Sequence, residues 1–175
     1  RTQPQVLDLC TGSSCIAVAI AKNSVVSNVT AVDLDPAVAE VARRNVQKHG
    51  LGERVQVLEG DLFAPVSGQQ FDVIVSNPPY VPDAEIATLE PDVRLHEPEL
   101  ALRGGADGLE IVRRIVQDAA NYLVEGGALL LEISSEQAES VSALFDATHS
   151  FEAARIAKDL AGKSRVVWAR KASGR

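Results

Sequence analysis

A tetrapeptide of asparagine, two prolines and tyrosine carries residues suited to chemistry at a nitrogen atom. Asn77, Pro78, Pro79 and Tyr80 follow the apolar run Phe71 to Val75. The side-chain oxygen of Asn77 and the main-chain carbonyl oxygen of Pro78 are two hydrogen-bond acceptors, and proline restricts where its carbonyl points. Together they can hold the two N–H bonds of a planar amide or amino nitrogen. The ring face of Tyr80 offers a flat group a surface for stacking.

This pair of acceptors favours group transfer to nitrogen. An amide nitrogen is a poor nucleophile because its lone pair is delocalised, and two acceptors at its N–H bonds favour a pyramidal geometry. Transfer of a methyl group from a sulfonium needs no strong base, because the sulfonium is a good leaving group. Catalysis is then mostly positioning, with the acceptors binding more tightly as positive charge develops. The competing interpretation is a proline-rich turn that only ends a strand.

A turn of small residues near the start of the chain is a candidate ligand site. The apolar run Val6 to Leu9 leads through the sequence Asp-Leu-Cys-Thr-Gly-Ser-Ser at positions 8–14 into an expected helix. Ligands of open α/β sheets bind at such turns, at the carboxyl ends of the strands. Gly12 lets the backbone approach a ligand closely. The Asp8 carboxylate either orders the loop or meets a ligand ammonium group, and the competing interpretation is a tight turn without a ligand.

Two further carboxylates follow the next two expected strands. Asp33 ends the second strand, where a carboxylate can grip a ribose diol. Asp61 and Leu62 follow the third strand, where an adenine would rest. A dinucleotide-binding protein would carry G-x-G-x-x-G in the first turn. This turn has one glycine, so we exclude nicotinamide binding.

Strands and helices alternate along the chain and place these residues at strand ends. The expected strands are Val6 to Leu9, Val29 to Val32, Val55 to Leu58, Phe71 to Val75, Ala128 to Ile133, Phe151 to Ala157 and Arg165 to Ala169. Alternating β and α units predict an α/β fold with a doubly wound, mostly parallel sheet. The last two strands have no helix between them, which predicts an antiparallel hairpin at the C-terminal edge.

The expected helices show their boundaries and buried faces. Ile16 to Ala21 and Glu136 to Phe145 read as the first and last helices. Between them, Asp35 and Pro36 suit the start of a helix that Gly50 ends. The apolar residues at helical spacing are Val38, Val41, Ala42 and Val46 in that helix and Leu109, Val112, Ile115 and Val116 in a later one, and we expect both sets to be buried.

The stretch Val81 to Gly105 is long, irregular and rich in proline and charge. Long loops in compact domains are usually functional or disordered. Because it follows the tetrapeptide directly, we expect it to be mobile without substrate and to help form the substrate pocket. Further on, Gly126-Gly127 is expected to form a tight turn before the strand Ala128 to Ile133.

Composition indicates a soluble globular protein with one domain over residues 1–175. Apolar residues make up 46% of the chain and charged residues 23%, with a formal net charge of -7. Such a charge disfavours nucleic acid as the main partner. Cys10 and Cys15 form neither a disulfide framework nor a metal-ligand set, and we expect two reduced, buried residues of a cytoplasmic protein. No apolar run reaches the roughly 18 residues of a membrane span, and no leader is visible.

Taken together, these residues resemble the protein N5-glutamine methyltransferases, most closely the HemK/PrmC family that modifies release factors. The resemblance covers essentially the whole chain. Its early pieces are Asp8 to Ser13, Val32-Asp33, Gly60 to Phe63 and Ser76 to Val81. The later pieces separate this family from DNA and RNA amino-methyltransferases, and they are Glu97-Pro98, Ala101-Leu102, Gly105, Asp107 to Leu109, Leu131 to Ile133, Gln137 and Lys158 to Gly162.

The resemblance implies a class I, Rossmann-like fold that uses S-adenosylmethionine (SAM). The implied cofactor-binding residues are Asp8, Cys10, Thr11, Gly12, Ser13, Ser14, Asp33, Asp61, Leu62 and Asn77. Asn77, Pro78, Pro79 and Tyr80 would bind the target glutamine and hold it for methyl transfer. The family's substrates are the glutamine of the Gly-Gly-Gln loop in class 1 release factors and, in a sister branch, a glutamine of a large-subunit ribosomal protein.

The chain departs from the family pattern in three respects. The family's turn usually carries glycines where this chain has Cys10 and Ser14, and Ser14 is expected to crowd the cofactor. Cysteine at the first position is similar to the ribosomal-protein branch, whereas Lys158 to Gly162 is similar to the release-factor branch. The chain begins a few residues before the first expected strand, so we expect the family's helical N-terminal domain, which helps bind the substrate, to be absent; either the chain is a fragment or it relies on another partner. Two alternatives therefore stay open: an amino-methyltransferase of nucleic acid and an inactive SAM-binding module.

Overall fold

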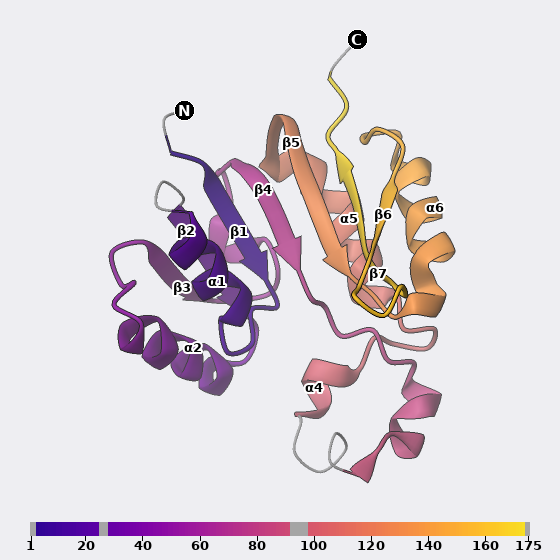
Figure 1. The fold of residues 1–175 in the computed structure, drawn as a ribbon, viewed down its shortest axis with the longest axis horizontal. Helices are drawn as coiled ribbons and strands as arrows, with labels where there is room; N and C mark the ends of the chain where they lie inside the picture. The colour runs from indigo at the N-terminus through magenta and orange to yellow at the C-terminus, as the bar shows by residue number, and fades with distance from the viewer. Residues whose placement is uncertain (1–2, 25–27, 92–97, 174–175) are drawn as a thin grey trace.

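A seven-stranded sheet forms the centre of the protein in a computed structural model that describes residues 3–24, 28–91 and 98–173 (Figure 1). The strands are β1 (Gln5–Leu9), β2 (Asn28–Asp33), β3 (Val55–Glu59), β4 (Phe71–Ser76), β5 (Leu123–Glu132), β6 (Arg155–Lys158) and β7 (Ser164–Arg170). Their order is β3-β2-β1-β4-β5-β7-β6. The first five run parallel, and β7 pairs antiparallel with both β5 and β6. The predicted doubly wound sheet and its antiparallel edge hairpin are thus confirmed.

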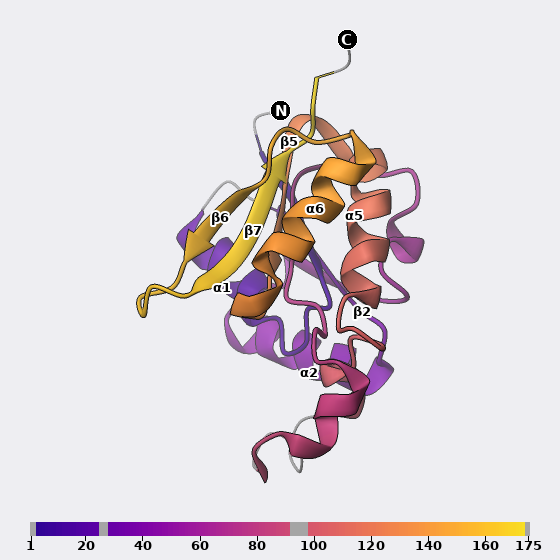
Figure 2. The ribbon, with the colours of Figure 1, turned by 90° about the vertical axis from the view of Figure 1, so that its right-hand side faces the viewer.

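Helices cover both faces of this sheet. The longer ones are α1 (Cys15–Asn23), α2 (Pro36–Lys48), α5 (Glu110–Tyr122) and α6 (Ala138–Thr148), and the shorter ones are η1 (Ala64–Val66), η2 (Asp83–Thr88), α4 (Glu99–Leu102) and η3 (Ser135–Gln137). Figure 2 shows α5 and α6 side by side on one face, with α1 beyond the sheet on the other. Within the described ranges, no helix is long and apolar enough to cross a membrane.

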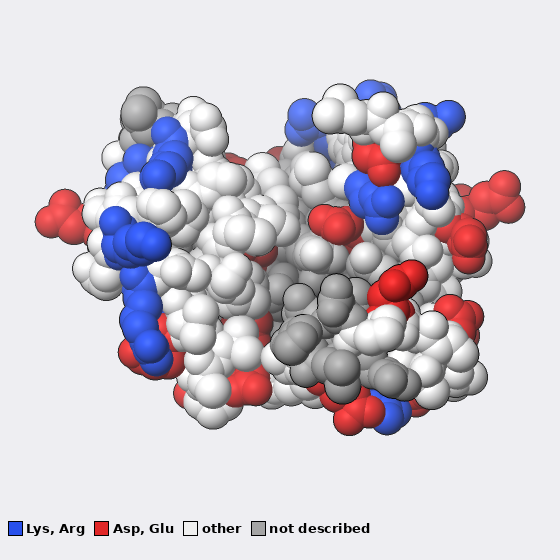
Figure 3. All heavy atoms as spheres, turned by 60° about the horizontal axis from the view of Figure 1, so that its bottom comes forward, with Lys and Arg blue, Asp and Glu red and all other residues white. Residues whose placement is uncertain are grey.

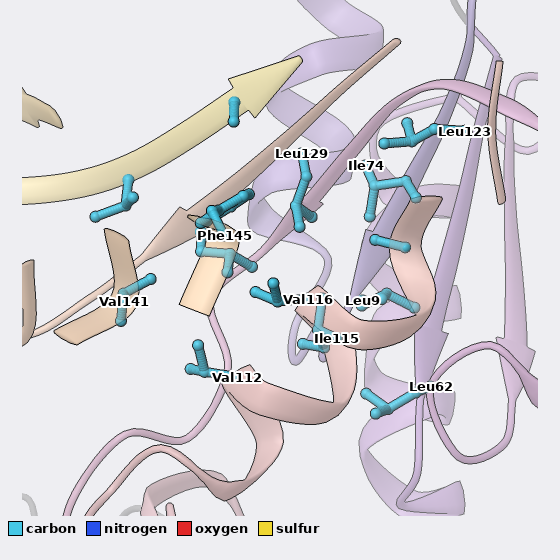
Figure 4. Close-up of a cluster of buried hydrophobic side chains, with 14 of the residues drawn as sticks. Leu9, Leu62, Ile74, Val112, Ile115, Val116, Leu123, Leu129, Val141 and Phe145 are labelled. Atoms are coloured by element: carbon cyan, nitrogen blue, oxygen red, sulfur yellow. The ribbon is translucent and has the colours of Figure 1, made fainter. Parts of the chain in front are cut away.

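The larger of two hydrophobic cores lies between the sheet and the helices α5 and α6 (Figure 4). Leu9, Ile74 and Leu129 come from three neighbouring strands and are fully buried. The predicted helical stripe of Leu109, Val112, Ile115 and Val116 is buried against them, which confirms that expectation. A smaller core on the opposite face joins α1 and α2 to strands β1, β2 and β3. The two cores hold the strand ends at one edge of the sheet in fixed positions.

Helix α2 begins and ends where the sequence predicts. Asp35 Oδ1 accepts a hydrogen bond of 2.8 Å from the Ala37 amide, and Gly50 follows the helix in a left-handed conformation with φ 67°. Of the predicted stripe, Ala42 and Val46 are buried and Val38 is half-buried, but the prediction is wrong at Val41, which is 45% exposed. The buried residues are Ala39, Ala42 and Val46. Their spacing of three and four residues defines one face, and position 41 lies about 100° away from position 42.

Two strand boundaries also differ from the expectation. Strand β5 begins at Leu123, so Gly126-Gly127 lies inside it and not in a turn before it. The pairing with β4 moves from Phe71↔Leu123 directly to Val73↔Ala128, which leaves the intervening residues as an irregularity of the strand. Gly126 adopts φ 71° there, a conformation that glycine allows without strain. Strand β6 begins at Arg155, later than the expected Phe151.

Candidate active site

The carboxyl ends of the parallel strands point downwards in Figure 1. Residues at and after these ends line one pocket. We call it the edge pocket. Seven residues singled out from the sequence line it: Cys10, Gly12, Asp33, Asp61, Leu62, Asn77 and Pro79. The structure therefore brings the first turn, both later carboxylates and the tetrapeptide to one site. Asp8, Thr11, Ser13, Ser14, Pro78 and Tyr80 lie outside this lining.

The turn between β1 and α1 adopts left-handed backbone conformations at alternate residues. Cys10 has φ 56°, Gly12 has φ 56° and Ser14 has φ 63°. Residues with a β-carbon enter this region at a cost that glycine avoids. Cys10 and Ser14 occupy positions at which the family named above usually carries glycine. The left-handed backbone explains that preference, because glycine adopts it without strain. At Gly12 an added β-carbon would meet nothing within 4 Å, so open space lies next to the turn.

A buried carboxyl group holds this turn from beneath. Asp8 is fully buried at the end of β1. Its Oδ2 accepts hydrogen bonds from Thr11 Oγ1 at 2.6 Å and from the Ala17 amide in the first turn of α1 at 3.2 Å. Asp8 therefore orders the loop, the first of the two roles predicted for it. Its Oδ1 has no hydrogen-bond partner in the structure.

The side chain of Ser14 belongs to the same buried group. Ser14 is fully buried, and its Oγ lies 3.2 Å from Thr11 Oγ1. Ser14 Oγ therefore lies beside Thr11, and Ser14 is outside the lining of the edge pocket, where it was expected to crowd the cofactor. Ser13 is exposed, and its carbonyl oxygen accepts a 2.9 Å hydrogen bond from Asn45 Nδ2 of α2.

Burial shifts the pKa of the Asp8 carboxyl upwards. Desolvation raises its pKa from 3.8 to about 7, and the negative charge of Asp33 adds to this rise. The hydrogen bonds from Thr11 and Ala17 act in the opposite direction, because they stabilise the carboxylate. The group consequently changes its charge near neutral pH.

The thiol of Cys10 forms a neutral part of the pocket wall. Burial raises its pKa to about 12, and the carboxylates of Asp33, Asp8 and Asp61 add to the rise, while a hydrogen bond with Ser76 lowers it. A protonated thiol is a poor nucleophile. Cys15, in contrast, is exposed, so the prediction that both cysteines are buried is wrong. Within residues 3–24, 28–91 and 98–173, no cluster of His, Cys, Asp and Glu is placed to hold a metal ion.

The Asp33 carboxylate connects the first turn to the start of α2. Its Oδ2 accepts a 2.8 Å hydrogen bond from the Gly12 amide, and its Oδ1 accepts one of 3.1 Å from the Asp35 amide. These two bonds fix the orientation of the carboxylate in the pocket lining. Each carboxylate oxygen accepts two hydrogen bonds, so Asp33 can still accept hydroxyl groups of a ligand.

The pocket wall at Asp61 contains an ion pair that the sequence did not suggest. Asp61 Oδ2 lies 2.7 Å from the Nη2 atom of Arg114, and both side chains are partly exposed. Arg114 lies on α5, next to the buried Ile115, and it lines the edge pocket together with Ile111 of the same helix. The sequence held a weak signal that Arg114 faces away from the core, because position 114 lies outside the apolar stripe of that helix. Leu62 is buried beside Asp61.

The tetrapeptide follows β4 directly and forms the pocket wall nearest the centre of the sheet. Ser76 Oγ donates a 2.8 Å hydrogen bond to the Leu9 carbonyl and so ties β4 to β1 directly before the tetrapeptide. Asn77 is exposed and faces the edge pocket, Pro78 is buried, and Tyr80 is half-buried. The Tyr80 carbonyl accepts a 3.0 Å hydrogen bond from Gln137 Nε2.

The segment after the tetrapeptide is more regular than expected. It contains η2 and α4, and its two ends are joined to each other at the base (Figure 1). Val81 donates to Leu102 at 2.9 Å, Gly104 donates to Val81 at 2.8 Å, and Asp83 donates to Gly105 at 3.0 Å. The expected loop over Val81 to Gly105 is thus closed at its base. Residues 92–97, including Glu97, lie outside the described residues.

Apolar side chains from this segment complete the pocket. Leu100 is 53% exposed, and Leu34 after β2 is 51% exposed, although both line the edge pocket. Apolar groups that face an open pocket are typical of ligand sites. The pocket thus combines a small-residue turn, apolar walls, three aspartates and two arginines, one of which is paired with Asp61. This set suits a nucleoside that also carries a positive charge, so the residues present fit SAM.

Comparisons with known proteins agree with this geometry. Residues 1–90 match the family described as "Methyltransferase small domain". A release factor glutamine methyltransferase of Gloeobacter violaceus is 46% identical over 170 residues, which cover 95% of this chain and 59% of that protein. A ribosomal protein uL3 glutamine methyltransferase of Bradyrhizobium diazoefficiens is 50% identical over 129 residues, which cover 74% of this chain and 40% of that protein. The chain therefore spans less than two thirds of the length of either relative.

A solved structure shows the same architecture at low sequence identity. The crystal structure of a methyltransferase from Pyrococcus furiosus superposes with a TM-score of 0.72 at 20% identity. The match covers 99% of this chain and 77% of that chain. At this level of identity the likeness shows the fold alone.

Proposed function

Because this chain belongs to the methyltransferase small domain family, we propose that it transfers a methyl group from SAM to the side-chain amide nitrogen of a glutamine in a protein. One observation carries the proposal. Asn77 and Pro79 of the tetrapeptide line the same pocket as Gly12 of the first turn and Asp33. The tetrapeptide, which is expected to bind the target nitrogen, thus lies beside the expected cofactor site. The fold is that of class I SAM-dependent methyltransferases.

The edge pocket supplies a place for each part of SAM. Asp33 would accept the ribose hydroxyls, Leu62 would pack against the adenine, and Asp61 would border its amino group. The first turn, with open space at Gly12, would lie along the amino-acid portion. When bound, SAM supplies an electrophilic methyl group on a positively charged sulfur. The acidic residues around the pocket favour a ligand of that charge.

The tetrapeptide would position the target nitrogen. The Asn77 side-chain oxygen and the Pro78 carbonyl would accept the two N–H bonds of the glutamine amide, and the Tyr80 ring would stack on its plane. These acceptors raise the electron density at the nitrogen and become more effective as it gains positive charge. Positioning of this kind accounts for several kcal/mol of a reaction barrier, on the order of 7 in favourable cases. The neutral Cys10 thiol takes no proton in this scheme.

The Gly-Gly-Gln glutamine of a peptide chain release factor is the proposed substrate. Several relatives that match at least 91% of this chain carry the name release factor glutamine methyltransferase. A glutamine of ribosomal protein uL3 is a second candidate, because the Bradyrhizobium relative of that name is 50% identical over its matched part. Either substrate would place the protein in the cytoplasm, where translation occurs.

The surface charge supports a protein substrate over nucleic acid. The chain carries a formal net charge of -7. Figure 3 looks towards the carboxyl edge of the sheet and shows basic side chains mainly at the two sides of this face, interspersed with acidic ones and with no continuous basic track among the described residues. A nucleic acid would need a basic track along its backbone path, and binding would then weaken strongly with salt.

Three substrates tested in parallel would decide between the candidates. The intact protein is mixed with methyl-labelled SAM and with a release factor, ribosomal protein uL3 or duplex DNA, and SAM affinity is measured by calorimetry. We expect labelling of the release factor. Labelling of uL3 alone would move the assignment to the second candidate, and labelling of DNA would overturn it. SAM binding without labelling of any substrate would indicate an inactive binding module.

A further inference from the structure

The side-chain amide of Gln137 joins three segments of the chain behind the tetrapeptide. We propose that Gln137 is a positioning residue that fixes the tetrapeptide backbone, and thereby aims the Asn77 and Pro78 acceptors at the target nitrogen. Gln137 ends η3, directly before α6, and lies outside the lining of the edge pocket. The inference rests on the proposed function for its kinetic consequences, whereas its structural content stands on hydrogen bonds alone.

Both ends of the Gln137 amide, the nitrogen and the oxygen, are hydrogen-bonded. Its Nε2 donates to the Tyr80 carbonyl at 3.0 Å and to the Gly108 carbonyl at 3.3 Å. Its Oε1 accepts from the Ser134 amide at 3.2 Å, as one half of a capping box. The donor side therefore contacts the end of the tetrapeptide, while the acceptor side is anchored to the turn after β5. Hydrogen bonds at both ends of a side-chain amide fix its orientation.

The two prolines explain why the tetrapeptide needs an external donor. Pro78 and Pro79 have no N–H group, so half of the tetrapeptide's amide donors are missing. A neighbouring element can then hold this stretch mainly through its carbonyl oxygens. The carbonyl of Tyr80 is the last one of the tetrapeptide, and Gln137 supplies its donor. On the other side, Ser76 is tied to Leu9 of β1, so the tetrapeptide is held at both ends.

The close approach at Gly108 makes the arrangement specific. A β-carbon at Gly108 would lie 2.4 Å from the Tyr80 carbonyl oxygen and 2.8 Å from Gln137 Nε2, and the residue has φ 74°. The backbone at 108 is thus packed against the same hydrogen bond. A glycine at this position and the glutamine amide together define where the Tyr80 carbonyl lies.

Loss of the Gln137 donors should affect turnover more than cofactor binding. The Asp33 and Gly12 side of the pocket makes no contact with Gln137, so SAM affinity is expected to change by less than threefold. A displaced Asn77 and Pro78 pair would hold the target nitrogen poorly, and an error of about 1 Å in such a position costs up to about 100-fold in rate. We therefore expect kcat to fall about 10-fold to 100-fold in Gln137→Met while KM for the protein substrate changes less.

Gln137→Glu gives a pH readout that a purely structural role would not produce. Its carboxylate keeps an acceptor for Ser134 but loses both donors and faces two carbonyl oxygens. At low pH the protonated carboxyl regains one O–H donor for the Tyr80 carbonyl. The rate of Gln137→Glu relative to the wild type should therefore rise as the pH falls, whereas the relative rate of Gln137→Met should stay flat. Gln117→Glu and Gln117→Met, at an exposed site on α5, are the matched controls.

Hydrogen exchange tests the inference without any activity. The Val81 amide directly follows the tetrapeptide and donates to Leu102. We expect it to exchange at least about tenfold faster in Gln137→Met than in the wild type, with both Gln117 variants unchanged. Unchanged exchange, or a folded Gln137→Met with wild-type kcat, would overturn the inference. If the wild type itself transfers no methyl group, the proposed function fails, and the exchange rates alone decide the role of Gln137.

Discussion

Single residues in the first turn carry conformations that most residues avoid. Cys10 and Ser14 both adopt left-handed backbone angles, which cost roughly 1 kcal/mol for a residue with a side chain. The Thr11 hydroxyl links Ser14 to the buried Asp8 carboxyl and so gives this strained turn a polar support. The same turn donates the Gly12 amide to Asp33. The cofactor side of the site is therefore built by hydrogen bonds beneath and beside the turn.

Asp33→Ala is predicted to weaken SAM binding by roughly 1–3 kcal/mol, or about 5-fold to 150-fold. The variant leaves the ribose hydroxyls without a charged acceptor and also frees the Gly12 amide. Calorimetric titration with SAM measures the effect. Ser14→Gly is the matched control, because its hydroxyl faces Thr11, and its affinity should equal that of the wild type. Equal affinity of Asp33→Ala and the wild type would show that Asp33 does not hold the cofactor.

Asn77→Ala is predicted to lower methyl transfer by about 10²–10³ while leaving folding intact. The exposed Asn77 side chain contributes little to the core, but it supplies one of two acceptors for the target amide. Asn77→Asp should also be folded and SAM-competent yet slow, because the charge around the amide nitrogen changes. Turnover and melting temperature are measured together. Near-normal turnover of Asn77→Ala would show that Asn77 has no role in methyl transfer and that the tetrapeptide only forms a turn.

The buried Asp8 carboxyl makes the free energy of unfolding depend on pH. Its pKa is about 7 in the folded protein, above the ordinary value of 3.8 that applies to the unfolded chain, so the folded state holds the proton more tightly. This group therefore costs no stability below about pH 4, and its cost grows as the pH rises to about 7. Between pH 5 and pH 8 the wild type should lose on the order of 2 kcal/mol relative to Asp8→Asn. The free energy of unfolding of both proteins is measured with urea at the two pH values. If the difference between wild type and Asp8→Asn is the same at pH 5 and pH 8, the prediction is wrong.

At the level of elements, the sequence predicted strands better than their irregularities. Alternation of apolar runs and small-residue turns located the five parallel strands, and the missing helix near the end predicted the hairpin of β6 and β7. The register shift before the pair Val73↔Ala128 could not be predicted from the sequence, because it depends on how β5 pairs with β4. The Asp61–Arg114 ion pair could not be predicted for a related reason, since it joins positions 53 residues apart. Contacts between distant segments require the three-dimensional packing.

The segment after the tetrapeptide is predicted to show two levels of mobility. Hydrogen bonds close its base at Val81, Asp83 and Gly104, whereas the residues of η2 are mostly exposed. In hydrogen exchange of the free protein, these three amides should therefore exchange more slowly than those of the remaining η2 residues, Ala84 to Thr88. Uniformly fast exchange over the whole segment would contradict the closed base, and uniformly slow exchange would contradict a mobile substrate-facing tip.

For the whole molecule, the arrangement of the sheet makes the site. Parallel strands β1, β2, β3 and β4 all end at one edge, so residues far apart in the sequence, such as Cys10 and Asn77, line one pocket there. The family and the fold imply the use of SAM, whereas the proposed protein substrate would be selected by surfaces around the edge pocket. The overall negative charge favours neither DNA nor RNA as substrate.

Mass spectrometry of a release factor after incubation with the intact protein and SAM tests the central proposal most directly. Fragment ions of the tryptic peptide that contains Gly-Gly-Gln locate any added methyl group. We predict one methyl group on the side-chain amide nitrogen of the glutamine, present with the wild type and reduced about 10²–10³-fold in rate with Asn77→Ala. A release factor that stays unmethylated, or a methyl group on any other residue, would contradict the proposed function.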